Sequence, residues 1–216
     1  MIHQKPIRLQ TLLIVLLAAP FCVNAQEKIY KIGDYYNVNS VEGVVFYITD
    51  GGRHGKIVSL DEAPKGAYWT TLYDNEETEA SVTGATSTTD GRKNTEIVSR
   101  LVTYTPAAFP AFAYCIAKGR GWYLPAIDEL KDIVSARAQD DLDTAIVKVG
   151  GGRFYEYYWS STEEISPAQK ADPDCRNCKD KPRRSPGALA IDLNDGQSFY
   201  YRKTDATYSA RAVHQF

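Results

Sequence analysis

Apolar and polar positions along the chain predict strands near both of its ends. Residues 43–50 form a β-branched and aromatic run, and residues 56–60 return as a second apolar stretch. Between them, Asp50-Gly51-Gly52 supplies residues that adopt the positive φ angles of a tight turn, so the two runs predict a β-hairpin. Later segments of similar composition are residues 157–161, 188–193, 198–202 and 208–213.

Four stretches in the middle of the chain place apolar residues at helical spacing. They are residues 97–101, 110–119, 127–134 and 142–149. In the third, Ile127, Leu130 and Ile133 share one face. Asp128 and Glu129 stand in its first turn, where the helix dipole favours negative charge. The pattern predicts an α+β fold with an antiparallel sheet, hairpins, two to four short helices and termini close together on a shared sheet.

The first 25 residues have the composition of a secretory signal peptide. Lys5 and Arg8 give a basic start, and an apolar run at residues 12–23 leads into the small-residue pattern Val23-Asn24-Ala25. This run is too short to anchor the protein, because a membrane-spanning helix needs about 20 apolar residues. We expect a single mature domain at residues 26–216, secreted across the inner membrane, without a membrane span, and periplasmic or extracellular at the cell surface.

Composition argues against a nucleic-acid partner. When Lys5 and Arg8 leave with the signal peptide, 23 of the 25 basic residues face 27 acidic ones, which gives a net charge of −4. No basic patch accompanies this balance. The chain has 15 Tyr against 7 Phe, and tyrosine suits a sugar-binding or protein-binding surface, although it is equally usual in antiparallel sheets.

Several short motifs occur in the order of one known family. They are Asp90-Gly91 with Asn94-Thr95, Ala113-Tyr114-Cys115, Gly121-Trp122-Tyr123-Leu124-Pro125 with Glu129-Leu130, Tyr158-Trp159-Ser160-Ser161-Thr162, and Ala210-Arg211-Ala212-Val213. Through them, residues 43–216 resemble the Lcl-type C-terminal domain family of bacterial collagen-like surface proteins. That family is largely a domain of unknown function in secreted proteins of gut bacteria, and the resemblance implies a divergent C-type-lectin-like fold.

The motif region also suggests a core and a weak helix start. We expect a structural core that contains Trp122, Leu124, Leu130, Trp159 and Ile191. Members of the family usually place Ser or Thr after the proline, where its hydroxyl caps the following helix, but Ala126 stands here. We therefore expect the first turn of that helix to be less stable by about 1 kcal/mol.

Calcium-dependent sugar binding lacks its usual motifs. C-type lectins of that kind use a Glu-Pro-Asn or Gln-Pro-Asp loop and a Trp-Asn-Asp strand, whereas this sequence has neither loop and has Leu193 before Asn194-Asp195. Calcium takes about six to eight converging oxygens. Asp61, Glu62 and the acidic residues among 74–79 can contribute oxygens but lack the spacing of a known loop. We therefore predict no cofactor and no metal site, with calcium as the alternative.

The function that the sequence favours is binding without catalysis. After signal-peptide cleavage only His54 and His214 remain as histidines, both where solvated histidines are common, and no catalytic residues can be proposed together. We expect a binding or adhesion module that recognises a glycan or protein at the cell envelope or surface.

The long polar segments at residues 61–94 and 164–186 are the predicted contact surface. Aromatic rings beside carboxylates suit sugars, and the candidate ligand-binding residues are Tyr68, Trp69, Tyr73, Asp74 and Glu76. The alternative interpretation is that the aromatic residues pin a long loop to the core.

Three cysteines remain in the mature chain: Cys115, Cys175 and Cys178. We expect Cys175 and Cys178 to form a disulfide in an oxidising compartment, or one of them to pair with Cys115. Their spacing is also half of a zinc site, but nothing places further ligands nearby, and a redox motif would need a strand-to-helix context. The alternative function is an exported enzyme or redox protein centred on Cys175 and Cys178.

Thiol titration tests the disulfide. We expect one free thiol in the unfolded, unreduced mature protein, because one disulfide leaves one of the three cysteines over. A count of three contradicts the disulfide, and stoichiometric zinc in the purified protein supports a metal site instead.

Overall fold

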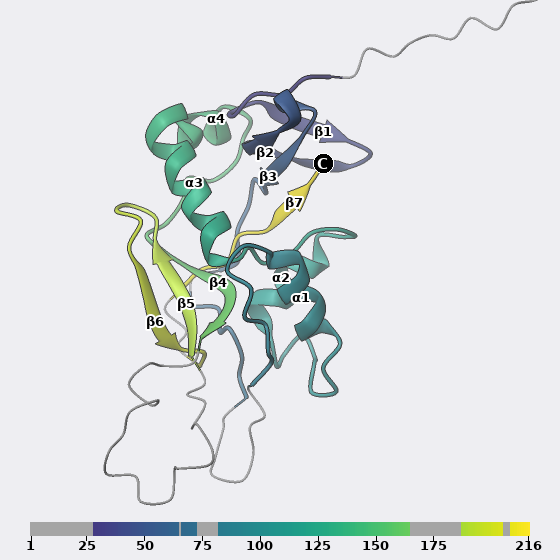
Figure 1. Ribbon diagram of the computed structural model, residues 1–216, viewed down its shortest axis with the longest axis vertical. Coiled ribbons are helices and arrows are strands. Elements are labelled where there is room, and N and C mark those ends of the chain that lie inside the picture. The colour runs from purple at the N-terminus through teal and green to yellow at the C-terminus, as the bar shows by residue number, and fades with distance from the viewer. Residues whose placement is uncertain (1–27, 65, 73–81, 165–186, 205–207) are drawn as a thin grey trace, which may run out of the picture.

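The computed structural model describes residues 28–64, 66–72, 82–164, 187–204 and 208–216. Over these residues the chain has the predicted α+β class, with two antiparallel sheets and four α-helices (Figure 1). The first sheet has the order β1-β2-β3-β7, formed by Tyr35–Val38, Val41–Thr49, His54–Val58 and Val213–Gln215. The second has the order β4-β5-β6, formed by Tyr157–Glu164, Gly187–Asp192 and Ser198–Arg202.

Three of the four helices match the stretches of helical spacing, whereas the first shares only its last residues with the stretch 97–101. The helices are α1 (Gly91–Ser99), α2 (Pro110–Ala117), α3 (Ile127–Asp140) and α4 (Leu142–Lys148). Helix α1 begins earlier than its apolar spacing indicates, because the Asp90 side chain caps it by accepting from the Lys93 N–H at 2.8 Å. Helix α3 contacts β2 of the first sheet and β4 and β5 of the second, so it joins the two sheets.

The β2–β3 hairpin is buried on both faces, which explains its continuous apolar run. Val44 and Phe46 pack with Ile127 of α3, whereas Val45 and Ile57 belong to a second cluster on the opposite face. Successive strand residues point to opposite faces, so a strand that is covered on both sides has no polar face to show in its sequence.

All five predicted core residues are buried, but they do not form one group. Trp122, Leu124 and Trp159 pack in the cluster that contains residues of α1 and α2, whereas Leu130 and Ile191 pack in the cluster with α3 and α4. The division follows from strand geometry, because neighbouring residues of β4 and β5 point to opposite faces of their sheet.

The C-terminal segment connects the two sheets instead of forming a strand over residues 208–213. Ser209 bridges to Tyr158 of β4, and β7 begins only at Val213. Between these points, the carbonyls of Ala210 and Ala212 accept hydrogen bonds from the irregular segment at residues 59–63. The prediction of one continuous strand is therefore wrong, because a loop and not a strand lies alongside the segment.

β7 brings the C-terminus beside the first described residues, as predicted. The ring centroid of Phe216 lies 5.1 Å from that of Tyr30 and 4.8 Å from that of Tyr36. The Tyr30 N–H donates to the Gly52 carbonyl at 2.9 Å. Both ends of the described chain therefore pack on the first sheet.

A buried carboxylate stands where the sheets and helices meet. Glu129 of α3 is 1% exposed, and its Oε1 accepts from the Lys56 ammonium at 2.8 Å and from the Tyr123 hydroxyl at 2.9 Å. Its Oε2 accepts from the N–H groups of Ala126 at 2.9 Å and Gly91 at 3.0 Å. We call this arrangement the Glu129 junction, comprising Lys56, Gly91, Tyr123, Ala126 and Glu129.

The junction explains why α1 begins with a glycine. A Cβ atom on Gly91 would lie 2.5 Å from both the Leu124 carbonyl oxygen and the Ala126 nitrogen, and 2.6 Å from Glu129 Oε2. Side chains larger than hydrogen therefore require the backbone to move. In this pair, Asp90 caps α1, and Gly91 allows the backbone to lie close to the Glu129 carboxylate.

Residues near the junction bind the N–H groups at the start of α3, where the sequence provides no capping side chain. The Ile127 N–H donates to the Thr162 hydroxyl at 3.1 Å, and the Asp128 N–H donates to the Thr88 carbonyl at 2.9 Å. The Ala126 N–H is bound by Glu129. Ala126 thus provides no side-chain cap, as expected, but tertiary partners satisfy the Ile127 and Asp128 N–H groups, and the lower stability of the first turn of α3 stays a prediction.

Motifs that are far apart in the sequence meet around this junction. The Asn94 amide donates to the Ser161 hydroxyl at 3.1 Å, and the Leu124 N–H donates to the Thr95 hydroxyl at 3.1 Å. The Ser161 N–H donates to the Pro125 carbonyl at 2.7 Å. These motif residues are therefore buried hydrogen-bonding and packing groups.

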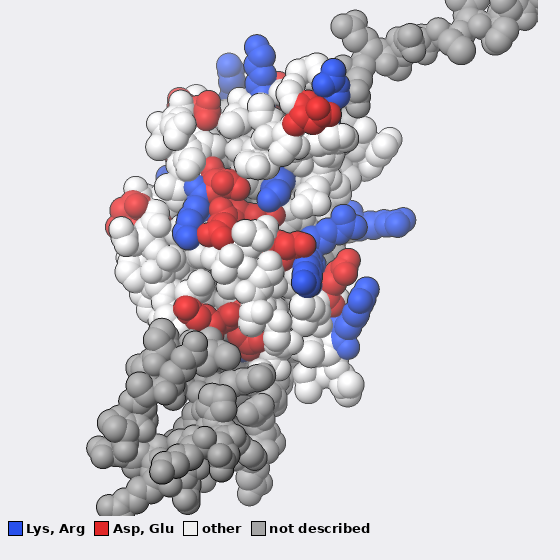
Figure 2. Space-filling model, in the orientation of Figure 1, with Lys and Arg blue, Asp and Glu red and all other residues white. Residues whose placement is uncertain are grey.

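Charged groups of both signs mix on the face shown in Figure 2. Acidic side chains gather in the centre of this view and basic side chains border them. This face therefore does not carry a field of a single sign. Within the described ranges, no helix combines the length and the apolar character that a membrane crossing requires.

Truncation of Trp159 tests the buried arrangement. The Trp159 side chain is fully buried, and its indole N–H donates to the Ala67 carbonyl at 2.9 Å. We expect Trp159→Ala to lower the free energy of unfolding by about 3 to 5 kcal/mol, because it leaves a large cavity. The control Val102→Ala, at a fully exposed side chain, should change it by less than about 0.5 kcal/mol. Chemical denaturation measures both, and unchanged stability of Trp159→Ala contradicts the assignment.

Candidate functional site

A pocket open to solvent lies where the β1–β2 turn, the end of β3 and the C-terminus of α2 meet. Its volume is about 160 Å³. The lining combines two carboxylates, one ammonium group, two hydroxyls and an indole, and consists of Ser40, Glu42, Ser59, Leu60, Asp61, Lys118 and Trp122. Several separate segments contribute to it, so the pocket exists only after these segments have packed.

Lys118 is the cation of the pocket, and it is committed to Asp61. It stands at the C-cap of α2, where the helix dipole favours positive charge. Its ammonium pairs with Asp61 Oδ1 and lies 5.3 Å from the ring centroid of Tyr114 and 5.9 Å from that of Trp122. The Lys118 side chain is 18% exposed and that of Asp61 is 67% exposed, so the carboxylate faces solvent far more than the amine does.

Opposing effects set the charge of Asp61. Partial burial raises its pKa, but the hydrogen bond and the charge of Lys118 lower it, and the net pKa lies below the ordinary value. The Asp61 carboxylate is therefore ionised at neutral and mildly acidic pH. Burial, followed by the charge of Asp61, raises the pKa of Tyr114, so this phenol stays neutral.

Glu42 is the second carboxylate and lies in β2 beside the edge strand β1. The Tyr35 hydroxyl donates to Glu42 Oε2 at 2.6 Å, and the Asn37 amide donates to the Tyr35 oxygen at 3.2 Å. The hydrogen bond to Glu42 raises the pKa of Tyr35. Glu42 itself is exposed, so its carboxylate is oriented by Tyr35 and remains accessible.

Buried Arg211 binds the backbone of the pocket wall at Ser59 and Leu60. Its Nε donates to the Ser59 carbonyl at 2.8 Å, and its Nη2 donates to the carbonyls of Leu60 and Gly152, each at 2.9 Å. The planar guanidinium fixes several acceptors at once, which an ammonium on a flexible stem does less well. Sequence analysis identified Arg211 only as part of a motif, and the structure makes it a support of the pocket.

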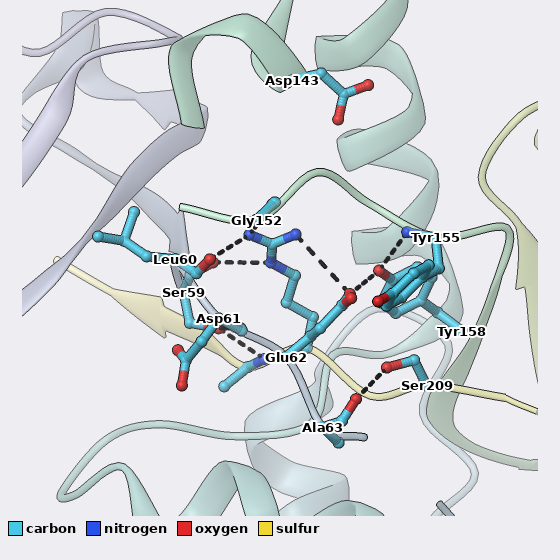
Figure 3. A network of polar contacts seen from close by, with 12 residues as sticks. Ser59, Leu60, Asp61, Glu62, Ala63, Asp143, Gly152, Tyr155, Tyr158 and Ser209 are labelled. Atoms are coloured by element: carbon cyan, nitrogen blue, oxygen red, sulfur yellow. Dashed lines mark hydrogen bonds and ion pairs between the residues drawn. The ribbon is translucent and has the colours of Figure 1, made fainter. Parts of the chain in front are cut away.

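Glu62 belongs to this buried network and not to the pocket lining. It accepts from the Tyr158 hydroxyl and lies 4.0 Å from Arg211 Nη1. Burial, followed by the hydrogen bond to Glu62, raises the pKa of Tyr158. In Figure 3 the carboxylates of Asp61 and Glu62 point in different directions, so they do not provide converging oxygens for calcium. Across the part of the chain that the structure describes, no three His, Cys, Asp or Glu residues gather as a metal site.

Of the residues predicted to bind ligand, the two that the structure describes, Tyr68 and Trp69, do not line this pocket. Tyr68 is 38% exposed, whereas Trp69 is wholly buried. The Trp69 indole N–H donates to the Ser160 carbonyl at 2.8 Å, and its ring centroid lies 4.8 Å from that of Phe112. Trp69 therefore pins the polar segment to the core, as the alternative interpretation holds. The remaining candidates, which lie outside the described residues, are Tyr73, Asp74 and Glu76.

Residues of the first long polar segment, 61–94, meet the residue before the second, 164–186, at buried Glu163 of β4. Glu163 accepts from the N–H of Thr83 at 2.9 Å and from its hydroxyl at 3.1 Å, and pairs with the Lys203 ammonium. The Lys203 carbonyl accepts from the Trp69 N–H at 3.1 Å. β4 ends at the next residue, Glu164. Thr83 of the first segment and the start of the second segment are therefore close together.

Cys115 is the member of the predicted disulfide group that the structure describes. It is a free thiol, wholly buried in α2. Burial raises the pKa of this thiol, which lowers its reactivity. Cys175 and Cys178 lie outside the described residues, so the pairing among the three cysteines stays a prediction.

The pocket residues carried little signal in the sequence. The sequence predictions do not include Glu42 or Lys118, and they include Asp61 as a possible calcium ligand and as the first residue of the contact segment 61–94. The one local cue is that Lys118 comes at the end of a predicted helix, a position that favours a cation. The pocket as a whole depends on chain segments that only the fold brings together.

Comparison of the chain with protein-family models finds no match, and comparison with curated proteins finds none either.

His214 supports the pocket from behind Trp122. Their ring centroids are 5.3 Å apart with the rings edge to face. Burial lowers the pKa of His214 below its usual value of about 6.5, against smaller opposing effects from the backbone at Arg120 and Gln215. Between the lowered pKa and the usual one, the unfolded chain binds more protons than the folded protein. The free energy of unfolding is therefore largest above the unfolded-state pKa and falls as the pH drops below it.

Replacement of His214 tests this linkage. We expect the wild-type protein to lose stability between about pH 7.5 and 5.5, and His214→Phe to lose less over the same interval, because phenylalanine keeps the ring contact and does not titrate. The control His54→Gln, at an exposed position in β3, should behave like the wild type. Urea denaturation at each pH measures the effect. Equal pH dependence in His214→Phe and the wild type rules out this role for His214.

Proposed function

We propose that this chain is an exported, non-catalytic binding or adhesion module that recognises a glycan or a protein at the cell envelope or surface. The observation that carries the proposal is the pocket formed by Glu42, Asp61, Lys118 and Trp122 with their neighbours. Ligand sites combine apolar or aromatic surface with a few polar groups in fixed positions. The Arg211 network provides that fixation for one wall of this pocket.

The contacts that the buried charged groups make support a binding function without catalysis. Glu129 accepts four hydrogen bonds or ion-pair contacts that hold secondary-structure elements together. Glu163 and Arg211 serve in the same way, each bonded to backbone groups. A catalytic acid or base must instead reach a substrate. Charged side chains that are hydrogen-bonded to backbone groups stabilise the scaffold.

The closeness of Thr83, in the first long polar segment, to the start of the second supports a protein as a second kind of ligand. Thr83 precedes α1, and Glu164 ends β4, yet Glu163 ties both regions to Lys203. Segments that leave a scaffold side by side can form one contact surface, as loops on rigid scaffolds commonly do. Residues 61–94 and 164–186 are therefore proposed to share a binding face.

We also propose a divergent C-type-lectin-like fold and membership of the Lcl-type family. Two small antiparallel sheets, four short helices and packed chain ends support this assignment. Convergence of the motifs at the Glu129 junction supports it further, since residues with a shared structural role are expected to recur together. Fold membership alone does not give a function, so the binding role stands on the pocket.

A binding screen tests the function. Mature protein, residues 26–216, is screened against glycans and against envelope and host proteins, and each hit is repeated with Glu42→Gln and Asp61→Asn. Each change removes one exposed carboxylate, and we expect it to weaken pocket binding about two- to tenfold, the range for loss of one charged hydrogen bond near the surface. The matched control is Glu96→Gln, at an exposed position of α1 outside the pocket lining.

The outcomes separate the hypotheses. Binding that survives both pocket changes moves the site elsewhere, to Tyr68 or the long segments. Turnover of a substrate that is lost on Cys175→Ser favours the exported enzyme or redox protein. Absence of any glycan or protein ligand contradicts the proposal.

A further inference from the structure

The electrostatics of the pocket narrow the class of ligand, on the basis of the proposed function. We infer that the pocket prefers sugars without negative charge, either neutral or amine-bearing, over acidic sugars. Two carboxylates, of Glu42 and Asp61, line it against the single ammonium of Lys118. The lining therefore carries an excess of one negative charge.

The carboxylates are also more exposed than the ammonium, which strengthens the excess of negative charge that a ligand meets. The Lys118 ammonium is paired with Asp61, lies over two aromatic rings and belongs to a side chain that is 18% exposed. The Asp61 side chain is 67% exposed, and Glu42 is exposed as well. An incoming ligand consequently meets carboxylates before it meets the amine. An acidic sugar would be repelled by both carboxylates and would have to displace Asp61 to reach Lys118.

Charges behind the pocket do not reverse the preference. The Arg211 guanidinium is buried and donates to the backbone carbonyls of Ser59 and Leu60. Glu62, 4.0 Å from Arg211 Nη1, balances its charge. This pair therefore adds no net charge to the pocket, and neither residue lines it.

The hydrogen-bonding groups indicate a ligand that donates. The Ser59 hydroxyl already donates to the Asp61 carbonyl at 2.7 Å and accepts from the Ala212 N–H at 3.3 Å. The exposed groups left to a ligand are mainly carboxylate oxygens, which only accept hydrogen bonds when ionised. Asp61 is held ionised by its lowered pKa. Sugar hydroxyls and protonated amines are donors of the required kind.

Three monosaccharides with the same ring test the preference: glucosamine, glucose and glucuronic acid. Binding to mature wild-type protein is followed by NMR titration at neutral pH and low salt. We expect glucuronate to bind about two- to fivefold more weakly than glucose, and glucosamine at least as tightly as glucose, which is the range for exposed charge pairs. Added salt should reduce these differences, because it screens exposed charges.

Charge reversal provides the decisive variant. Glu42→Lys changes an exposed side chain, so the protein should fold, and it should bind glucuronate more tightly than glucosamine. The matched control Glu96→Lys makes the same change in net charge on α1 and should keep the wild-type order. This control separates the pocket from the overall charge of the protein.

Each outcome decides the inference. A wild-type preference for glucuronate, or an unchanged order in Glu42→Lys, overturns it and leaves the binding function standing if sugars still bind. Failure of all three sugars to bind also overturns it, and a protein ligand found in the screen would then sustain the proposed function alone. The same reversal in Glu96→Lys as in Glu42→Lys shows a non-specific charge effect and overturns the assignment to this pocket.

Discussion

The buried carboxylate of Glu129 is the interaction on which the arrangement of the fold depends. It binds Lys56 of β3, the start of α1 at Gly91 and the start of α3 at Ala126. A buried carboxylate is costly without full compensation, and here a cation, a phenol and two backbone N–H groups provide it. The same bonds fix the elements relative to one another, so the electrostatic requirement of one side chain becomes a constraint on the whole structure.

The pocket depends on a second group of the same kind. Arg211 holds the carbonyls of Ser59 and Leu60, and these residues form the wall beside Asp61. The two carboxylates of the pocket lining are exposed, whereas the Arg211 guanidinium that positions the wall is buried. The buried hydrogen bonds therefore hold the pocket wall in place, and the exposed carboxylates stay available to a ligand.

Glu163 and Lys203 organise a different region of the molecule. Their buried pair ties Thr83 to β4 and places the backbone of Trp69 beside them. This buried pair thus holds Thr83 of the first polar segment beside the start of the second. A pocket for a small ligand and a base for longer segments are separate features of one scaffold, which is why the proposed function includes both glycan and protein ligands.

The sequence by itself determined the elements whose signals are local. Helical spacing located α2, α3 and α4, and the apolar run with its Asp-Gly-Gly turn located the β2–β3 hairpin, because hydrophobic periodicity and turn chemistry act over a few residues. β1 escaped prediction because it is a mostly exposed edge strand without an apolar face. Burial of the five predicted core residues also followed from composition.

Only the tertiary structure decided what the polar and aromatic residues do. Trp69 was a candidate for ligand binding and became part of the core, and Ala126 lacked a cap that Thr162 supplied from a distant strand. The pocket joins Glu42 to Lys118, which are far apart in the sequence. A side chain's neighbours across the fold set its exposure, its charge and its hydrogen bonds, and no local pattern encodes those neighbours.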